Sequence, residues 1–142
     1  MQVMKVVSSI ILAALSIVFL SAVSCKSQPA TVDLNQEFQL KPGEKVNIDR
    51  ENILLEFVGV TQDSRCPAGA VCIQAGQVVC IIHLISSGTV YEASLTELGH
   101  SQQSEQTVLG YRFTFNVIPY PEVGHDIHSG NYRLVLKMSK TV

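Results

Sequence analysis

Apolar and polar residues alternate along most of the chain after residue 33, with the two-residue period that is typical of β-strands. The alternation is clearest in residues 111–118 and 132–138, where only Ile118 and Val135 interrupt it. Five further runs show the pattern less completely and are also predicted as strands: 38–40, 46–48, 53–61, 77–86 and 90–95. The pattern therefore predicts about seven short strands.

Turn residues separate these runs, as in residues 41–44 (Lys-Pro-Gly-Glu) and in Ser87-Gly88. The run 77–86 is apolar on both faces and predicts a central strand that is covered on both sides. Residues 95–106 contain Gly and several Ser and Gln, which favours a loop over a helical turn. We predict an all-β fold for residues 34–142: a single β-sandwich, immunoglobulin-like or a similar Greek key. The chain lacks Trp and a long-range Cys pair, the immunoglobulin hallmarks.

The first 24 residues have a different pattern. Lys5 is followed by an apolar run, 6–23, that only serines interrupt. A charged start, an apolar stretch and small residues before a boundary are typical of a secretory signal helix. A buried helix of the domain is disfavoured because the run has no polar face. Its length of about 18 residues also fits a retained membrane span, which is the competing interpretation.

Cys25 follows the small residues Ala22 and Ser24, which suit cleavage directly before the cysteine. The freed thiol could then accept a lipid, and the segment resembles the bacterial lipobox. It departs from that pattern because Leu, commonest at the position of Ala22, is found here at Leu20. Secretion without lipid is the alternative.

These observations predict a lipoprotein signal peptide at 1–24 and a polar, lipidated tether at 25–33. The predicted location is the bacterial cell envelope, with the membrane contacted through the lipid on Cys25. Lys26 stands where an Asp often retains lipoproteins at the inner membrane, so the resemblance favours the outer membrane.

Three cysteines remain once Cys25 is assigned to lipid, an odd number for an oxidising compartment. Cys66 and Cys72 flank a short segment that can fold back on itself, whereas Cys80 lies within an apolar run. We predict a Cys66–Cys72 disulfide and a free Cys80. Thiol chemistry and metal binding are the alternatives, although the spacings match neither C-x-x-C redox motifs nor zinc pairs.

The segments DSRCP (63–67) and CIQAG (72–76) resemble the D-S-R-C-P…C-x-W-A-G signature of small, uncharacterised bacterial lipoproteins. Gln74 stands where the signature has an aromatic residue. The likeness extends to the run 54–60 and to the end of the chain around Tyr111, Pro119-Tyr120-Pro121 and Tyr132, hence over most of the predicted domain. The resemblance implies a lipoprotein and an all-β fold, and it implies no activity.

Asp63 and Arg65 within this signature have two interpretations. They can form a local ion pair that hydrogen-bonds loop carbonyls. Alternatively, an exposed Arg65 on a stapled loop can dock a carboxylate or a protein partner. The sequence favours the structural interpretation and leaves Asp63 and Arg65 as a candidate interaction loop.

His125, Asp126 and His128 place two imidazoles and a carboxylate within four residues. Zinc and copper sites use such ligands, so these residues are a candidate metal site. The segment lies between Pro121 and Gly130, however, where an exposed loop is the simpler interpretation. Further ligands would have to come from elsewhere, and the recruits are His83, His100 and Glu122.

The composition narrows the function further. Without the signal the chain has a formal charge of about −3 and no Lys/Arg run, which argues against nucleic acid as a partner. It contains no G-x-S-x-G, H-E-x-x-H or phosphate-loop motif. We therefore expect a non-catalytic, lipid-anchored binding or assembly module with an envelope protein as partner. The alternatives are a periplasmic metal-binding protein without other cofactors, and a small hydrolase or inhibitor acting through its loops.

Overall fold

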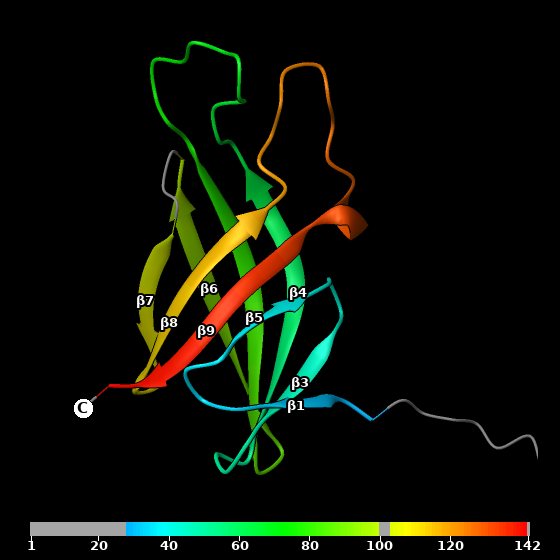
Figure 1. The fold of residues 1–142 in the computed structure, drawn as a ribbon, viewed down its shortest axis with the longest axis vertical. Helices are drawn as coiled ribbons and strands as arrows, with labels where there is room; N and C mark the ends of the chain where they lie inside the picture. The colour runs from blue at the N-terminus through cyan, green and yellow to red at the C-terminus, as the bar shows by residue number, and fades with distance from the viewer. Residues whose placement is uncertain (1–27, 100–102, 142) are drawn as a thin grey trace, which may run out of the picture.

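The computed structural model describes residues 28–99 and 103–141, and almost all of their regular structure is β-strand. Two sheets pack face to face as a β-sandwich, which confirms the predicted fold class (Figure 1). The strands are β1 (Ala30–Val32), β2 (Glu37–Leu40), β3 (Lys45–Ile48), β4 (Ile53–Asp63), β5 (Gln77–Ser86), β6 (Thr89–Leu98), β7 (Ser104–Val108), β8 (Tyr111–Ile118) and β9 (Arg133–Lys140). A short 3-10 helix, η2 (Ser129–Asn131), precedes β9.

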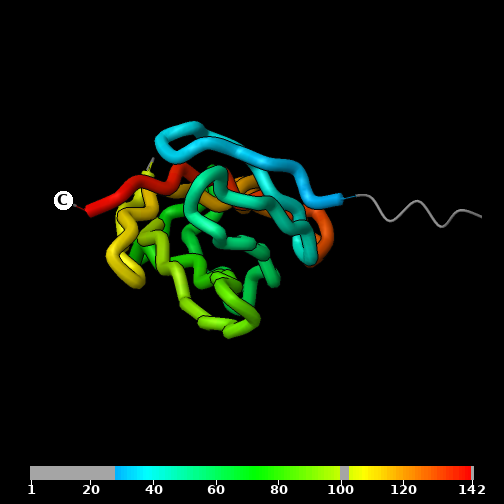
Figure 2. The backbone as a smooth tube through the Cα atoms, turned by 90° about the horizontal axis from the view of Figure 1, so that it is seen from below, coloured from blue at the N-terminus to red at the C-terminus, as the bar shows by residue number. Residues whose placement is uncertain are grey.

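The first sheet has the order β1-β3-β4-β5-β6 and the second has the order β2-β9-β8-β7. Strands β3 to β6 form an antiparallel meander, while β1 runs parallel to β3 at one edge. The chain crosses from the first sheet to the second before β2 and returns to the first sheet after β2. It crosses to the second sheet again between β6 and β7. Viewed from below, the β5–β6 hairpin lies on one side of the molecule and β2 with β9 on the other (Figure 2).

The second sheet has the strand order of a Greek key. Strands β7, β8 and β9 are consecutive antiparallel neighbours, and β2 from early in the chain lies beside β9. The loop from β8 to β9 is long and begins with a cis peptide bond between Ile118 and Pro119. This loop and the one between β4 and β5 project from the same end of the sandwich (Figure 1).

The hydrophobic core lies between the two sheets and follows the predicted alternation. The largest fully buried side chains include Phe57 of the first sheet and Phe113, Phe115 and Leu136 of the second. Along β5, the inward residues from Val78 to Leu84 are buried and those between them are half-buried. The expectation that β5 is covered on both faces is therefore wrong: in the described part of the chain no third layer covers its outer face.

The strand count exceeds the expected seven, because nine strands form within the described residues. Strand β1 falls inside the predicted tether 25–33, and β7 falls partly inside the predicted loop 95–106. Both are short edge strands of mostly polar or small residues, so they carry no two-residue pattern. Backbone pairing to a neighbour, which leaves no trace in the sequence, holds them in place.

The predicted signal peptide, residues 1–24, and Cys25 lie outside the described residues. Among the residues that are described, no helix is long and apolar enough to span a membrane.

Candidate functional site

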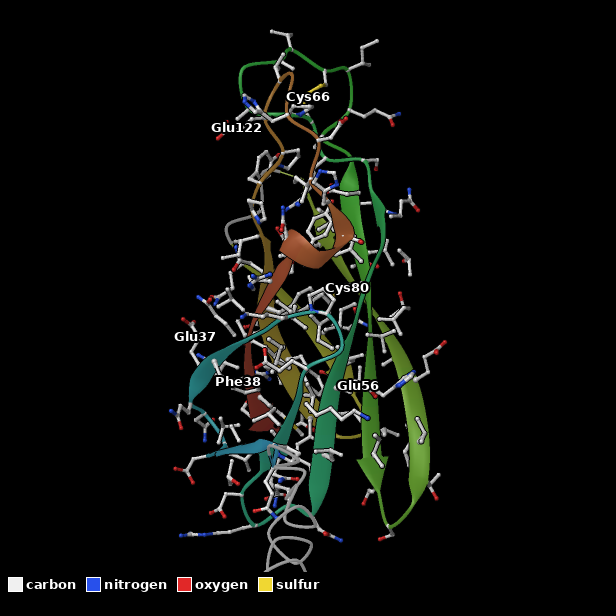
Figure 3. The ribbon with its side chains drawn as sticks, turned by 90° about the vertical axis from the view of Figure 1, so that its right-hand side faces the viewer. Glu37, Phe38, Glu56, Cys66, Cys80 and Glu122 are labelled. Atoms are coloured by element: carbon white, nitrogen blue, oxygen red, sulfur yellow. A yellow bond between two sulfur atoms is a disulfide. The ribbon has the colours of Figure 1, made fainter. Side chains whose placement is uncertain are left out.

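Two loops meet at one end of the sandwich, residues 64–76 after β4 and residues 119–132 after β8 (Figure 1). Backbone hydrogen bonds join them: the N–H of Ala68 donates to the carbonyl of Pro121 over 2.8 Å, and the N–H of Val123 donates to that of Ala68 over 3.4 Å. Cys66 and Glu122 accordingly lie at the same end of the molecule (Figure 3). We call residues 66–76 and 119–131 together the tip.

A disulfide closes the first loop of the tip. Cys66 and Cys72 are bonded, with their Cα atoms 5.9 Å apart, and Cys80 is free and buried, as predicted. Burial, together with the charge of nearby Glu97, raises the pKa of Cys80 to about 12. The Cys80 thiol is therefore protonated at neutral pH and unsuited to nucleophilic or redox chemistry.

Arg65 lies directly beneath the tip and forms a bidentate pair with Asp63. Its Nε donates to Oδ1 of Asp63 over 2.9 Å, and its Nη2 donates to Oδ2 over 2.6 Å. The backbone N–H of Arg65 also donates to Oδ1. Charge-assisted, bidentate contacts of this kind fix the geometry of both side chains. The end of β4 thereby holds the start of the disulfide loop.

The same guanidinium holds the second loop of the tip. Nη1 of Arg65 donates to the carbonyl of Val117 over 2.7 Å, and Nη2 donates to that of Pro119 over 3.1 Å. The guanidinium also lies over the ring of Tyr120, 4.9 Å from its centroid. One side chain thus connects two loops that are more than 50 residues apart in the sequence.

Glu97 completes this network from the end of β6. Its Oε2 accepts the backbone N–H of Val117 over 2.6 Å, and its Oε1 lies 3.7 Å from Nη1 of Arg65. Glu97 was not predicted as a site residue, because the strand predicted from the sequence ends at Leu95. A signal was present, since Glu97 is two residues after Leu95 and so faces the core side of the same strand.

The network contains one positive and two negative groups, because the guanidinium of Arg65 faces the carboxylates of Asp63 and Glu97. Burial raises the pKa of Glu97, and the hydrogen bond from Val117 and the charge of Arg65 oppose this increase without cancelling it. Burial also acts to raise the pKa of Asp63, but the hydrogen bonds from Arg65 outweigh it and hold that pKa below its usual value. Tyr132 adds a further hydrogen bond to Oδ2 of Asp63 over 3.1 Å. Asp63 is therefore the primary partner of Arg65.

These contacts decide between the two interpretations of Asp63 and Arg65. Arg65 is only 3% exposed, and its polar groups face Asp63, Glu97, a carbonyl at the end of β8 and a carbonyl of the loop that follows. It is not available to dock a carboxylate or a partner at the surface. The pair forms the local ion pair that supports the loops.

The tip itself presents apolar side chains to water. Val71 and Ile73, on either side of Cys72, are 105% and 104% exposed, and Val123 in the other loop is 57% exposed. Single exposed aliphatic residues are common, but apolar side chains that gather on one part of a surface mark sites of interaction. These residues were not predicted from the sequence. The signal was two aliphatic residues in a short loop closed by cysteines.

The candidate metal residues are not brought together. His125 and Asp126 border a hollow beneath Tyr120, and His128 is not among its lining residues. Among the further candidate ligands, Oε2 of Glu122 lies 4.0 Å from Nδ1 of His125. His83 instead contacts Glu56 and Glu92 on the outer face of the first sheet. His100 lies outside the described residues. The residues that the structure describes contain no group of three or more His, Cys, Asp or Glu placed to hold a metal ion.

A shallow hollow of about 600 Å³ lies between the two loops. Pro67 and residues 121–127 form its walls, and Asp63, Arg65 and Tyr132 form its floor. Asp63, Arg65 and Tyr132, the polar residues of this lining, are already engaged in the network. Comparison with protein-family models, with curated proteins and with solved structures finds no match for this chain. Its function is therefore inferred from its own residues.

Proposed function

We propose that this chain is a lipid-anchored protein of the bacterial envelope whose β-sandwich acts as a non-catalytic binding module. Lipid on Cys25 holds the domain at a membrane, in our proposal the outer membrane, and the tip contacts a protein partner. The observation that carries the binding role is the complete exposure of Val71 and Ile73 on a loop that a disulfide and a buried ion pair hold in place.

The anchor is supported by the order of residues at the start of the chain. A basic residue, a long apolar run and small residues precede Cys25, as export and lipidation require. The resemblance of residues 63–76 to small bacterial lipoproteins agrees with this assignment. Two or more acyl chains give durable attachment, whereas one chain holds a protein only marginally.

The tip is suited to binding because its apolar groups are already ordered. Full burial of a Val or Ile side chain contributes about 1.5–3 kcal/mol. Flexible loops lose part of such a gain when they become ordered on binding. The Cys66–Cys72 disulfide and the contacts of Arg65 meet that cost during folding, so more of the gain remains for association.

The charges of the tip indicate the chemistry of the partner. Glu122 and Asp126 are its acidic residues, and residues 66–76 and 119–131 include no Lys or Arg. An anionic lipid surface would repel these carboxylates. The tip instead complements a protein surface with an apolar recess bordered by basic residues.

The binding role can be tested with a photo-crosslinking amino acid at position 73 of the full chain in intact cells. We expect one reproducible adduct with a protein that mass spectrometry identifies. The purified lipoprotein in detergent should then bind that protein directly, and V71S/I73S should bind at least tenfold more weakly. The matched control is L109S, which removes an exposed apolar residue from the β7–β8 turn and should not alter the affinity. Unchanged affinity of V71S/I73S would contradict the proposal.

The anchor is tested separately with C25A. We expect the C25A protein to leave the membrane fraction on alkaline washing, because it cannot carry lipid. C80A, which removes only a buried thiol, should stay with the membrane. Retention of C25A after the wash would contradict lipid anchoring.

A further inference from the structure

Strand β6 forms a free edge of the first sheet. Its inner side pairs with β5 over all ten residues, in one unbroken register. No further strand of that sheet follows it within the described residues. In Figure 3, its lower half forms the right-hand margin of the molecule. Backbone groups on the outer side of β6 are therefore directed away from the first sheet.

The direction of each backbone group follows from two contacts with Gln106. Its Nε2 donates to the carbonyl of Ser94 over 2.7 Å, and its Oε1 accepts the N–H of Thr96 over 3.4 Å. The backbone groups of even-numbered residues in β6 thus point outward, since alternate residues of a strand direct them to the same side. Gln106 covers the upper half of the edge. Val90 and Glu92, in the lower half, direct an N–H and a carbonyl outward with no partner among the described residues.

This lower half lacks most of the features by which proteins block edge strands. Charged side chains, Lys above all, prolines and bulges commonly prevent pairing at an exposed edge. Residues 89–93 (TVYEA) contain no Lys or Pro, their register with β5 has no bulge, and Glu92 is their single charged residue. Val90 and Tyr91 are 55% and 45% exposed, so apolar surface accompanies the open backbone groups.

We propose that a second copy of this chain pairs with this edge, so that two β6 strands join antiparallel and the two sheets become one. With Tyr91 on the two-fold axis, Val90 lies opposite Glu92 of the second copy. Each of these residues then donates one backbone hydrogen bond and accepts another, and the symmetry repeats the pair.

The side chains fit this arrangement. Glu92 faces Val90 of the second copy and not a second Glu92, so no like charges stand directly opposite. The two Tyr91 rings meet at the axis as a cross-strand aromatic pair. His83 contacts Glu92 on the outer face of the sheet, over 3.2 Å, and does not cover the edge. A second copy fits because every outward residue supplies both a donor and an acceptor, which makes the edge complementary to itself.

V90P tests the pairing. It removes an N–H that points outward, so the bonds to β5 are kept, and proline is tolerated at such edge positions. For the full-length lipoprotein in detergent, sedimentation should give a dimer, and V90P should weaken association at least tenfold. Its folding is checked by an unchanged circular dichroism spectrum. A monomeric wild-type protein, or a V90P dimer of unchanged strength, would overturn the proposal.

Y91C gives a measurement that does not depend on V90P. The two thiols that this substitution places at the axis should form a disulfide-linked dimer in the envelope, and V90P in the same chain should abolish it. L109C, an exposed position away from the edge, should give no such dimer. Equal crosslinking of L109C, or an adduct of Y91C with another protein instead of itself, would contradict pairing between copies. Crosslinking from position 73 at the tip is expected to persist in V90P, which separates this test from that of the binding role.

Discussion

The interior of the sandwich and the network beneath the tip place polar and apolar groups in opposite ways. Between the sheets, nearly all buried side chains are apolar, with Phe57, Phe115 and Leu136 fully enclosed. Beneath the tip, the buried groups are charged, and the aliphatic side chains of the loop above them face water. The first region gains its stability from removing apolar surface from water. The second depends on each charge keeping its partner.

This difference indicates what each region does. An apolar interior tolerates exchanges of similar volume, because no single contact decides the outcome. A buried ion pair is weak evidence for stability, yet removing one partner is costly because the other charge is left uncompensated. The network beneath the tip therefore serves mainly to position two loops. Its central pair, Arg65 and Asp63, cannot be exchanged singly.

The largest loss of stability is expected for R65M. The methionine side chain has nearly the same bulk as that of arginine but no charge. The substitution leaves Asp63 and Glu97 without a counterion, and the carbonyls of Val117 and Pro119 without the donors that Arg65 supplies. Breaking a buried pair in this way costs about 3–5 kcal/mol. Urea unfolding of the purified full chain would measure the loss. R112M, at an exposed position of β8, is the control and should change stability by less than about 0.5 kcal/mol. A loss for R65M as small as that of the control would remove the contrast between the two regions.

A smaller effect is expected for C66A/C72A. The disulfide closes a loop with a sequence separation of 6 residues, and the chain-entropy model gives about 2 kcal/mol for a loop of that size. Because Arg65 remains, the network should still hold the base of the loop, and Val71 and Ile73 should become more mobile. Thermal unfolding measures the change, and a reductant should lower the wild-type midpoint by a similar amount. If reduction and the double substitution leave the midpoint unchanged, the disulfide adds nothing to what the ion pair provides.

The sandwich could be predicted because its interior imposes a period of two on the sequence. Strands with one buried face, such as β8 and β9, carry that period over most of their length. Strands β1 and β7 were missed because they are held by backbone pairing at edges and bury few side chains. The outer face of β5 was misjudged since its apolar residues are half-buried by neighbours within the sheet instead of by another layer.

The site was predictable only where its residues are close in the sequence. Asp63 and Arg65 lie in one short motif, and Cys66–Cys72 closes the adjacent loop, so their roles followed from local chemistry. Glu97 belongs to the same network but comes from another strand, and only the fold places it beside Arg65. Whether Arg65 faced solvent depended on the carbonyls of Val117 and Pro119, more than 50 residues away, which spacing along the chain does not reveal.

The smallest change in stability at pH 7 is expected for E97Q. This variant is also the sharpest test of the charge on Glu97. Because burial raises the pKa of Glu97 above its usual value of 4.5, the folded state binds a proton that the unfolded state has released. Wild-type stability should therefore fall as the pH rises from 4.5 through the folded pKa, and then level off. In E97Q this decline disappears, and stability at pH 7 should equal that of the wild type or exceed it by up to about 1 kcal/mol.

Asp63, which is present in both the wild type and E97Q, makes stability depend on pH in the opposite direction. Its lowered pKa contributes stability above pH 3.8, which is lost as the pH falls through the folded value, so acid unfolding should persist in E97Q. Urea unfolding between pH 3 and 8 separates the two groups, because only the difference between E97Q and the wild type reports Glu97. A large loss of stability in E97Q at pH 7 would mean that Arg65 needs both carboxylates, and that the network is balanced by Glu97 as much as by Asp63.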